Sequence, residues 1–190
     1  MIDPRQVTAV IVTKGGVDLG DQSNPGLFGE ALIWDNSQCV ASGNSDVKVY
    51  GRYLAALEAS NEYVYVQDDD CVIDVERLCA EYQPGELLCN VKPAHHAVYS
   101  QQYPGITLVG WGAIFPKSMI DFSPYLSRYP EDELFLRECD RVFTWLNRAK
   151  TRVVDLGVQD LPHAFGKDRM GCELRHGNDL MEIRRRLATL

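Results

Sequence analysis

The chain has 190 residues, of which 45% are hydrophobic and 24% charged, a composition typical of a folded globular protein and not of a disordered one. Its length predicts a single domain over 1–190 with a core of its own. The formal net charge is −8, and a negative surface repels phosphate polymers, so tight binding of nucleic acid gains no support. The sequence shows neither a signal peptide nor an apolar run long enough to cross a membrane, and we expect a cytoplasmic protein.

The first half of the chain alternates between strand-like and helix-like segments. Residues 7–13 are a continuous run of β-branched and apolar residues, which is typical of a buried strand. Residues 51–60 instead carry apolar side chains at helical spacing, and Asp74 stands where the helix after it needs an N-cap. The predicted strands of this half are 7–13, 31–34, 47–50 and 62–67, and the predicted helices are 51–60 and 75–81.

The second half is less regular. Residues 105–115 predict a strand, a glycine turn and a second strand, and 132–147 show the clearest helical pattern of the chain. A helix start at 117–122, a strand at 151–158 and an amphipathic helix at 179–190 complete the prediction. Strands that alternate with helices indicate an α/β domain with a mostly parallel sheet. Ligands of such sheets bind at the carboxyl ends of the strands, which here follow Thr13, Trp34 and Gln67.

The six cysteines give no sign of a metal or redox site. No two of them form a Cys-x-x-Cys pair, which argues against a structural zinc ion. Their even number would allow disulfides, but without a secretory signal we expect free, buried thiols. They are Cys39, Cys71, Cys79, Cys89, Cys139 and Cys172.

Three consecutive aspartates, Asp68, Asp69 and Asp70, directly follow the predicted strand at 62–67. Adjacent carboxylates repel one another, so a chain that clusters them commonly binds a cation. Hard oxygen ligands suit Mg²⁺ or Mn²⁺, which keep bound waters and share the phosphates of a substrate. The alternative is a solvated turn, or a cluster that favours the start of the next helix.

The order of these features resembles the GT-A class of nucleotide-sugar-dependent glycosyltransferases, over nearly the whole chain. The first strand ending in Thr13 and Lys14 resembles the family's opening strand near the nucleotide base, and Asp35 and Asn36 resemble the nucleoside-contacting end of its second strand. The helix at 51–60 and the segment YVYVQDDD resemble the approach to the family's DxD motif. The resemblance implies that Asp68 and Asp70 contact the ribose, the metal and the diphosphate, with Asp70 the direct metal ligand, and that Arg52 and Asp69 belong to the donor site.

Later motifs continue the resemblance. Gly110, Trp111 and Gly112 are similar to a glycine-rich loop where backbone approaches the sugar. Glu131 and Asp132, opening a helix, resemble the family's xED motif, in which Asp132 would be the general base, although an acidic residue there also favours a helix N-terminus. His163 or His176 resembles the late histidine that completes the metal shell, and each could instead be structural or exposed. Lys167, Arg169 and Arg175 could reach a diphosphate or be solvated charges.

The resemblance implies a GT-A (Rossmann-like) fold with a mostly parallel sheet flanked by helices. It also implies a metal-dependent transfer, with Mn²⁺ or Mg²⁺, of a hexose or pentose from a nucleotide diphosphate sugar, most often a UDP-sugar, to an acceptor hydroxyl. A glycan, a small molecule or a modified DNA base remains open as acceptor, as do inversion or retention of the sugar's configuration. The amphipathic tail could pair with a second copy to form a homo-oligomer.

Two other functions fit parts of the pattern. A nucleotidyltransferase has a similar core and carboxylate-held Mg²⁺, but the segment from Thr13 to Gly16 only faintly matches the basic, glycine-rich signature expected after its first strand. A non-enzymatic metal-binding or sugar-binding module would bind ligand without turnover. A P-loop NTPase is disfavoured, because no Gly-x-x-x-x-Gly-Lys-Ser/Thr motif exists in the chain.

Overall fold

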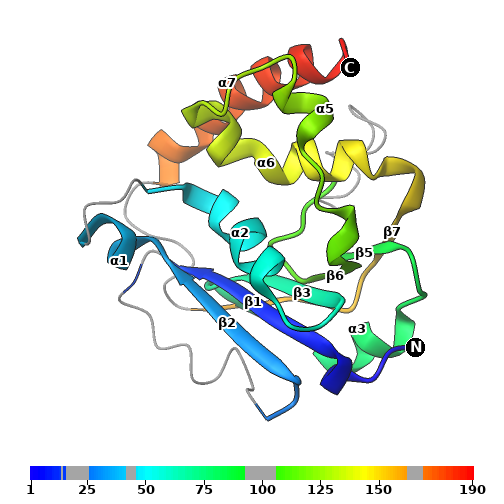
Figure 1. Ribbon diagram of the computed structural model, residues 1–190. Helices are drawn as coiled ribbons and strands as arrows, with labels where there is room; N and C mark the ends of the chain where they lie inside the picture. Colours follow the sequence, from blue (N-terminus) through cyan, green and yellow to red (C-terminus); the bar gives the residue numbers. More distant parts are fainter. Residues whose placement is uncertain (14, 16–25, 42–45, 93–105, 162–168) are drawn as a thin grey trace.

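A computed structural model describes residues 1–13, 15, 26–41, 46–92, 106–161 and 169–190, and gives no side-chain description for 39–41, 160 and 169–177. Its centre is a six-stranded sheet with helices on both faces (Figure 1). The strand order is β2-β1-β3-β6-β5-β7, and of these strands β6 alone runs antiparallel to the others. The strands are β1 (Val7–Thr13), β2 (Glu30–Asp35), β3 (Tyr63–Asp68), β5 (Leu87–Asn90), β6 (Ala113–Pro116) and β7 (Thr151–Val154). The mostly parallel α/β sheet predicted from the sequence is confirmed.

Two short strands, β4 (Cys71–Val72) and β8 (Gln159–Asp160), form a separate antiparallel pair. The helices are α1 (Asn36–Ala41), α2 (Gly51–Glu58), α3 (Val75–Glu81), α5 (Ser123–Leu126), α6 (Glu133–Leu146) and α7 (Arg169–Leu187). Single turns of 3₁₀ helix lie at Pro4–Gln6, Lys48–Tyr50, Lys117–Met119 and Arg148–Lys150. None of the helices in these described segments is long and apolar enough to cross a membrane.

The sheet is buried on both faces because its side chains alternate between two apolar clusters. Val64 and Val66 of β3 face the larger cluster, to which α2 contributes Tyr53 and α6 contributes Phe143. The side chain between those two valines, Tyr65, faces the smaller cluster with α3. Figure 1 shows α2 and α6 over one face, with α7 farther out along α6.

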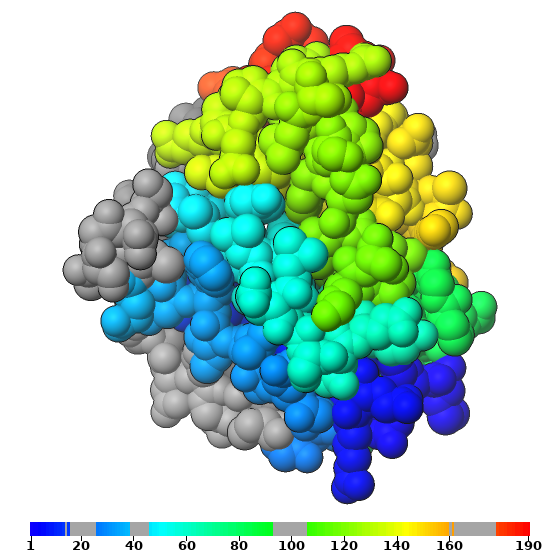
Figure 2. Space-filling view, in the orientation of Figure 1, coloured from blue at the N-terminus to red at the C-terminus, as the bar shows by residue number. Residues whose placement is uncertain are grey.

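The carboxyl ends of the first three parallel strands lie at one edge, as the sequence predicts. Thr13 of β1 pairs with Asp35 of β2, and Val12 pairs with Asp68 of β3. The space-filling view shows the first residues of the chain at one end of the displayed face and α7 at the other, with the segments of α2 and α5 between them (Figure 2). The strand ends that meet at the edge, Thr13, Asp35 and Asp68, come from segments distant in sequence.

The predicted strand at 47–50 is wrong, because these residues form a 3₁₀ turn, Lys48–Tyr50. The Asp46 carboxylate accepts a hydrogen bond from the Lys48 amide (2.8 Å), and the Asn36 side chain donates to the Lys48 carbonyl (3.0 Å). These bonds satisfy the backbone locally and override the strand propensity of the valines.

The predicted strand before the glycine turn, within 105–115, is also wrong in its described part. The Thr107 amide donates to Thr144 Oγ1 on α6 and not to a strand (3.2 Å), and the bond from the Asp68 amide of β3 to the Gly110 carbonyl (2.8 Å) lies in the turn that follows. The largest boundary differences are that α7 begins at Arg169 instead of 179, that β7 ends at Val154 instead of 158, and that α5 follows a 3₁₀ turn where one helix start was expected. The strand β5 and the helix α1 were not predicted.

Four cysteines, Cys71, Cys79, Cys89 and Cys139, are free and buried, as expected. Burial raises the pKa of the Cys79 thiol to about 12, so this sulfur stays protonated and unreactive at neutral pH. The other two cysteines lie outside the side chains that the structure describes.

Candidate functional site

The acidic triplet lies at the carboxyl end of β3, on the edge that β1 and β2 share. Asp68 is the last residue of this strand, and Asp69 and Asp70 form the turn that leads into β4. All three side chains are half-buried. The Asp70 carbonyl accepts a hydrogen bond from the Leu161 amide (2.8 Å), which ties the turn to the residue after β8. The triplet is therefore a fixed part of the fold at the edge where α/β sheets bind ligands.

A buried arginine holds the first of these aspartates. Arg52, on α2, is 0% exposed, and its Nη2 donates to Asp68 Oδ1. Its Nη1 lies 3.3 Å from Asp140 Oδ2 on α6. Although burial alone would lower the pKa of the guanidinium, the carboxylates of Asp140 and Asp68 raise it, so Arg52 stays charged. The sequence resemblance assigned Arg52 to the donor site. In the structure its side chain is fully buried and contacts the Asp68 carboxylate from the interior of the protein.

Gly110 packs directly against the same carboxylate. Its carbonyl accepts a hydrogen bond from the Asp68 amide, and a Cβ at this position would overlap Asp68 Oδ2. Only glycine therefore allows the loop to approach this closely. Two residues on, Gly112 has φ +95°, a conformation that other residues rarely adopt, and a Cβ there would overlap Ile73.

Asn90, at the end of β5, fixes the rest of this glycine loop. Its Nδ2 donates to the carbonyls of Trp111 (3.1 Å) and Gly157 (3.0 Å), and its backbone amide donates to Gly112 (2.8 Å). The half-buried Trp111 ring lies 5.2 Å from Lys92 Nζ, in cation–π contact, and the same ring packs against the larger core cluster. Asn90 was not singled out from the sequence, because β5 was not predicted.

The ends of β1 and β2 also contribute to the edge. Thr13, only 5% exposed, donates a hydrogen bond from its hydroxyl to Asp69 Oδ2 (2.6 Å) and so joins β1 to the triplet.

At the end of β2, the Asp35 carboxylate accepts hydrogen bonds from the Ser37 hydroxyl (2.6 Å) and amide (2.8 Å), which lower its pKa and keep it ionised. The buried Asn36 bonds to Trp34 and Lys48 through its two amide atoms, so its side chain is engaged within the chain.

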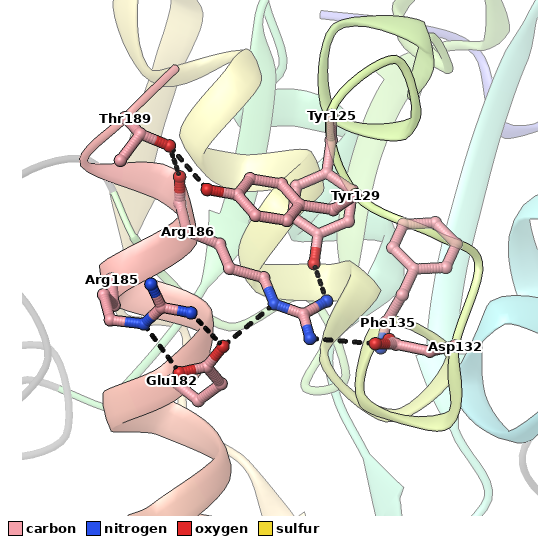
Figure 3. Close-up of polar contacts among 8 residues, drawn as sticks. All are labelled: Tyr125, Tyr129, Asp132, Phe135, Glu182, Arg185, Arg186 and Thr189. Carbon is pink, nitrogen blue, oxygen red and sulfur yellow. Dashed lines mark hydrogen bonds and ion pairs between the residues drawn. The ribbon is translucent and has the colours of Figure 1, made fainter.

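Asp132 is the N-cap of α6, and both of its carboxylate oxygens are engaged (Figure 3). Oδ1 accepts from the Phe135 amide (2.9 Å), and Oδ2 accepts from Arg186 Nη2 of α7 (2.8 Å). Burial of the carboxyl acts to raise its pKa, but the hydrogen bonds from Arg186 and Phe135 outweigh burial and lower it. Asp132 is therefore ionised at neutral pH. At a rise of 1.5 Å per residue, it lies about 12 Å along α6 from Asp140.

Arg186 makes further contacts that join three helices. It donates to the Tyr125 hydroxyl (3.0 Å) and to Glu182 (3.1 Å), and its guanidinium lies 5.2 Å from the centre of the Tyr129 ring. Figure 3 shows this guanidinium between α7 and the start of α6. The sequence predicts only an amphipathic helix here, and Arg186 is an internal contact of it, with its side chain 14% exposed.

Several predicted site residues cannot be placed. Lys14, His163 and Lys167 lie outside the described residues, and the side chains of Arg169, Arg175 and His176 are likewise not described. Glu131 is exposed and precedes the N-cap of α6. Asp140 and Arg186, like Asn90, were not predicted from the sequence, since each pairs with a residue far away along the chain.

The oxygen donors at this edge fit a hard divalent cation, but they do not enclose one. Among the described residues, no group of three or more His, Cys, Asp or Glu side chains converges as a complete metal site. Asp68 Oδ1 and Asp69 Oδ2 are each hydrogen-bonded within the chain. Mg²⁺ and Mn²⁺ do not require a full protein cage, because they are commonly held by one or two carboxylates together with waters and substrate phosphates.

A cavity of about 380 Å³ lies elsewhere, at the opposite edge of the sheet. It is lined by residues at the start of β3 and the end of β6, such as Tyr63 and Pro116, together with Asn147 and Lys150. None of the aspartates of the triplet lines this cavity, so we place the candidate site by its chemistry and by the strand ends.

Comparisons with known proteins identify the fold. Neither the family models nor the curated proteins give a match. Two solved structures of glucosyl-3-phosphoglycerate synthase from Mycobacterium tuberculosis are similar to the chain over 97% of its length and 80% of theirs. One, in complex with Mn²⁺, uridine-diphosphate-glucose and phosphoglyceric acid, has a TM-score of 0.52 at 12% identity. The other, with Mg²⁺ and uridine-diphosphate, has a TM-score of 0.51 at 14% identity. The chain therefore has a GT-A-like fold, as the sequence resemblance implied, and at such identities the likeness extends to the fold alone.

Proposed function

We propose that the chain is a metal-dependent glycosyltransferase that moves a sugar from a nucleotide diphosphate sugar, with UDP favoured, to an acceptor hydroxyl. The observation that carries the proposal is the acidic triplet at the carboxyl end of β3, where Arg52 and Gly110 fix the Asp68 carboxylate. The fold supports it, because the similar structures hold a uridine nucleotide together with Mn²⁺ or Mg²⁺.

In the proposed reaction the acceptor oxygen forms a bond to the anomeric carbon of the sugar. The bond from that carbon to the diphosphate breaks, its electron pair leaves with UDP, and the acceptor hydroxyl gives up its proton. Bound Mn²⁺ or Mg²⁺ would neutralise the charge that develops on the departing diphosphate. Asp70 and Asp68 would hold the ion, with His163 or His176 as a further ligand.

The donor site would lie along the ends of the first three strands and the glycine loop. There Thr13 and Asp69 fix the turn, and Gly110 and Gly112 let backbone approach the sugar. Asn36 and Arg52 are both buried. Their side chains would not contact the donor directly, but would hold the more exposed residues of the donor site in position. Together with these, the proposed donor-site residues are Lys14, Asp35, Asp68 and Trp111.

Asp132 is the proposed general base, with Glu131 beside it. The lowered pKa keeps its carboxylate ionised and ready to accept a proton, although a base of low pKa is a weak one. To accept a proton from the acceptor hydroxyl, Oδ2 has to exchange the hydrogen bond from Arg186 for one from the substrate. We propose that acceptor binding causes this exchange. The acceptor remains a glycan, a small molecule or a modified DNA base.

Product analysis separates this function from its alternatives. Purified protein is incubated with UDP-glucose and Mn²⁺, with and without added nucleophiles such as simple sugars and glycerol, and the nucleotide products are separated by ion-exchange chromatography. We expect UDP as the nucleotide product. In a parallel incubation with UTP and glucose 1-phosphate, formation of UDP-glucose with release of pyrophosphate would favour a nucleotidyltransferase. Binding without any turnover would favour a binding module.

A further inference from the structure

Arg52 connects two carboxylates that come from different elements of the fold. It projects from α2, and it reaches Asp68 at the end of β3 through Nη2 and Asp140 on α6 through Nη1. A fully buried guanidinium is tolerated only when its charge is paired and hydrogen-bonded. The two carboxylates supply the opposite charge, and Asp68 accepts a hydrogen bond from the guanidinium. Nε and Nη1 of Arg52 make no hydrogen bond among the described residues, so the hydrogen bond to Asp68 and the ion pair with Asp140 hold the guanidinium in its orientation.

Asp140 is itself held in place. The hydroxyl of Tyr53, the neighbour of Arg52 on α2, donates to Asp140 Oδ1 (2.8 Å), which leaves Oδ2 directed at Arg52. The Asp140 side chain is only 19% exposed, whereas that of Asp68 is 36% exposed. The chain of contacts thus runs from the interior, through a buried arginine, to a carboxylate that meets solvent.

We propose that Asp140 is a positioning residue for the metal and donor site, acting through Arg52 on the Asp68 carboxylate. This inference rests on the proposed function. Arg52 donates a hydrogen bond to Asp68 Oδ1, and Gly110 can lie against Asp68 Oδ2 because it has no Cβ. The Asp68 carboxylate is thereby fixed between α2 and the glycine loop, while its side chain stays 36% exposed to solvent.

Asp140 also shares the positive charge of Arg52. With two carboxylates around it, the guanidinium neutralises neither completely, and Asp68 keeps part of its attraction for a cation. If Asp140 lost its charge, Arg52 would pair with Asp68 alone and would lie nearer to a bound cation that it repels. Metal affinity would fall although no metal ligand had changed. Removing such an outer partner of a metal ligand typically weakens metal binding about 10- to 100-fold.

The test is the binding of Mn²⁺ in the presence of UDP, measured from the electron paramagnetic resonance signal of free Mn²⁺. We expect Asp140→Asn, which keeps the shape of the side chain, to weaken Mn²⁺ binding about tenfold. Asp140→Glu, which keeps the charge, should bind more tightly than Asp140→Asn. If the role of Asp140 were purely structural, Asp140→Asn would bind Mn²⁺ more tightly than Asp140→Glu, because Asn has the size of Asp whereas Glu is larger. Glu133→Gln is the matched control, since it removes one charge from an exposed position of the same helix and should leave binding unchanged.

Tyr53→Phe keeps the proposal testable if Asp140→Asn does not fold. This variant removes only the hydroxyl that orients Asp140, and we expect Mn²⁺ binding to weaken severalfold with an unchanged circular dichroism spectrum. Wild-type affinity in every folded variant would overturn the role of Asp140 and leave the proposed function standing. Wild-type protein that binds neither Mn²⁺ nor UDP would overturn the proposed function, and this inference with it.

Discussion

At Gly110 the backbone of the glycine loop packs against the Asp68 carboxylate. The Gly110 carbonyl accepts the amide of Asp68, and its Cα leaves no room for a Cβ beside Asp68 Oδ2. Since a side chain at this position would meet the carboxylate and not an apolar neighbour, the requirement for glycine arises from the site itself.

Gly110→Ala should move the Asp68 carboxylate and lower the affinity for UDP with Mn²⁺ about tenfold, because the new methyl group occupies the position of Oδ2. Calorimetric titration with UDP in the presence of Mn²⁺ measures this effect. Gly26→Ala is the control, because a Cβ there meets no atom within 4 Å among the described residues. Equal affinities in the two variants would show that the position of Asp68 does not matter for binding.

Asp132→Asn separates catalysis from capping. Asparagine is as good an N-cap as aspartate, so α6 should stay intact, but the amide cannot accept a proton. If Asp132 is the base, release of UDP from UDP-glucose should slow by roughly 100-fold or more, while UDP affinity stays the same. A rate equal to that of the wild type would remove Asp132 from the mechanism and leave it as a structural cap.

At the scale of elements, α6 links the candidate site to the C-terminal helix. Its N-cap, Asp132, is bonded to Arg186 of α7, and two turns farther along Asp140 faces Arg52. The same helix also packs on the sheet through Phe143. A displacement of α7 would therefore act on the start of α6 and on the residues that we assign to the acceptor side.

Arg186→Ala should lower the free energy of unfolding by about 2 kcal/mol, since it removes a partly buried ion pair, a hydrogen bond to Tyr125 and a ring contact. Urea denaturation followed by circular dichroism measures the change. The adjacent Arg185, which is 68% exposed and pairs with Glu182, is the matched control, and Arg185→Ala should leave the unfolding curve unchanged. Equal curves for both variants would mean that the contacts of Arg186 add nothing to stability.

At the scale of the whole molecule, the sequence predicts the parts of the fold that local pattern determines. The run at 7–13 can only be a buried strand, and the strand leading into the triplet is equally clear, so both appear where expected. The strand β5 was missed because four residues are too few to show a period. The valines at 47–50 suggested a strand, whereas side-chain bonds from Asp46 and Asn36 impose a turn.

The candidate site divides in the same way. The acidic triplet and the glycines of the loop are motifs that can be recognised within a few residues, and the strand-end rule correctly placed the ends of β1, β2 and β3 at one edge. The contacts of Arg52 with Asp140 and of Asp132 with Arg186 join residues far apart in sequence. No local pattern reveals such pairs, because they depend on how the helices pack on the sheet.

The most direct test of the proposed function is a calorimetric titration of the wild-type protein and of Asp70→Asn with UDP, in the presence and absence of Mn²⁺. We predict that the wild type binds UDP only when Mn²⁺ is present, and that Asp70→Asn loses this binding while its circular dichroism spectrum stays the same. Metal-dependent binding of equal strength in the two proteins, or no binding of UDP by the folded wild type, would contradict the proposal that the acidic triplet holds a metal and a nucleotide-sugar.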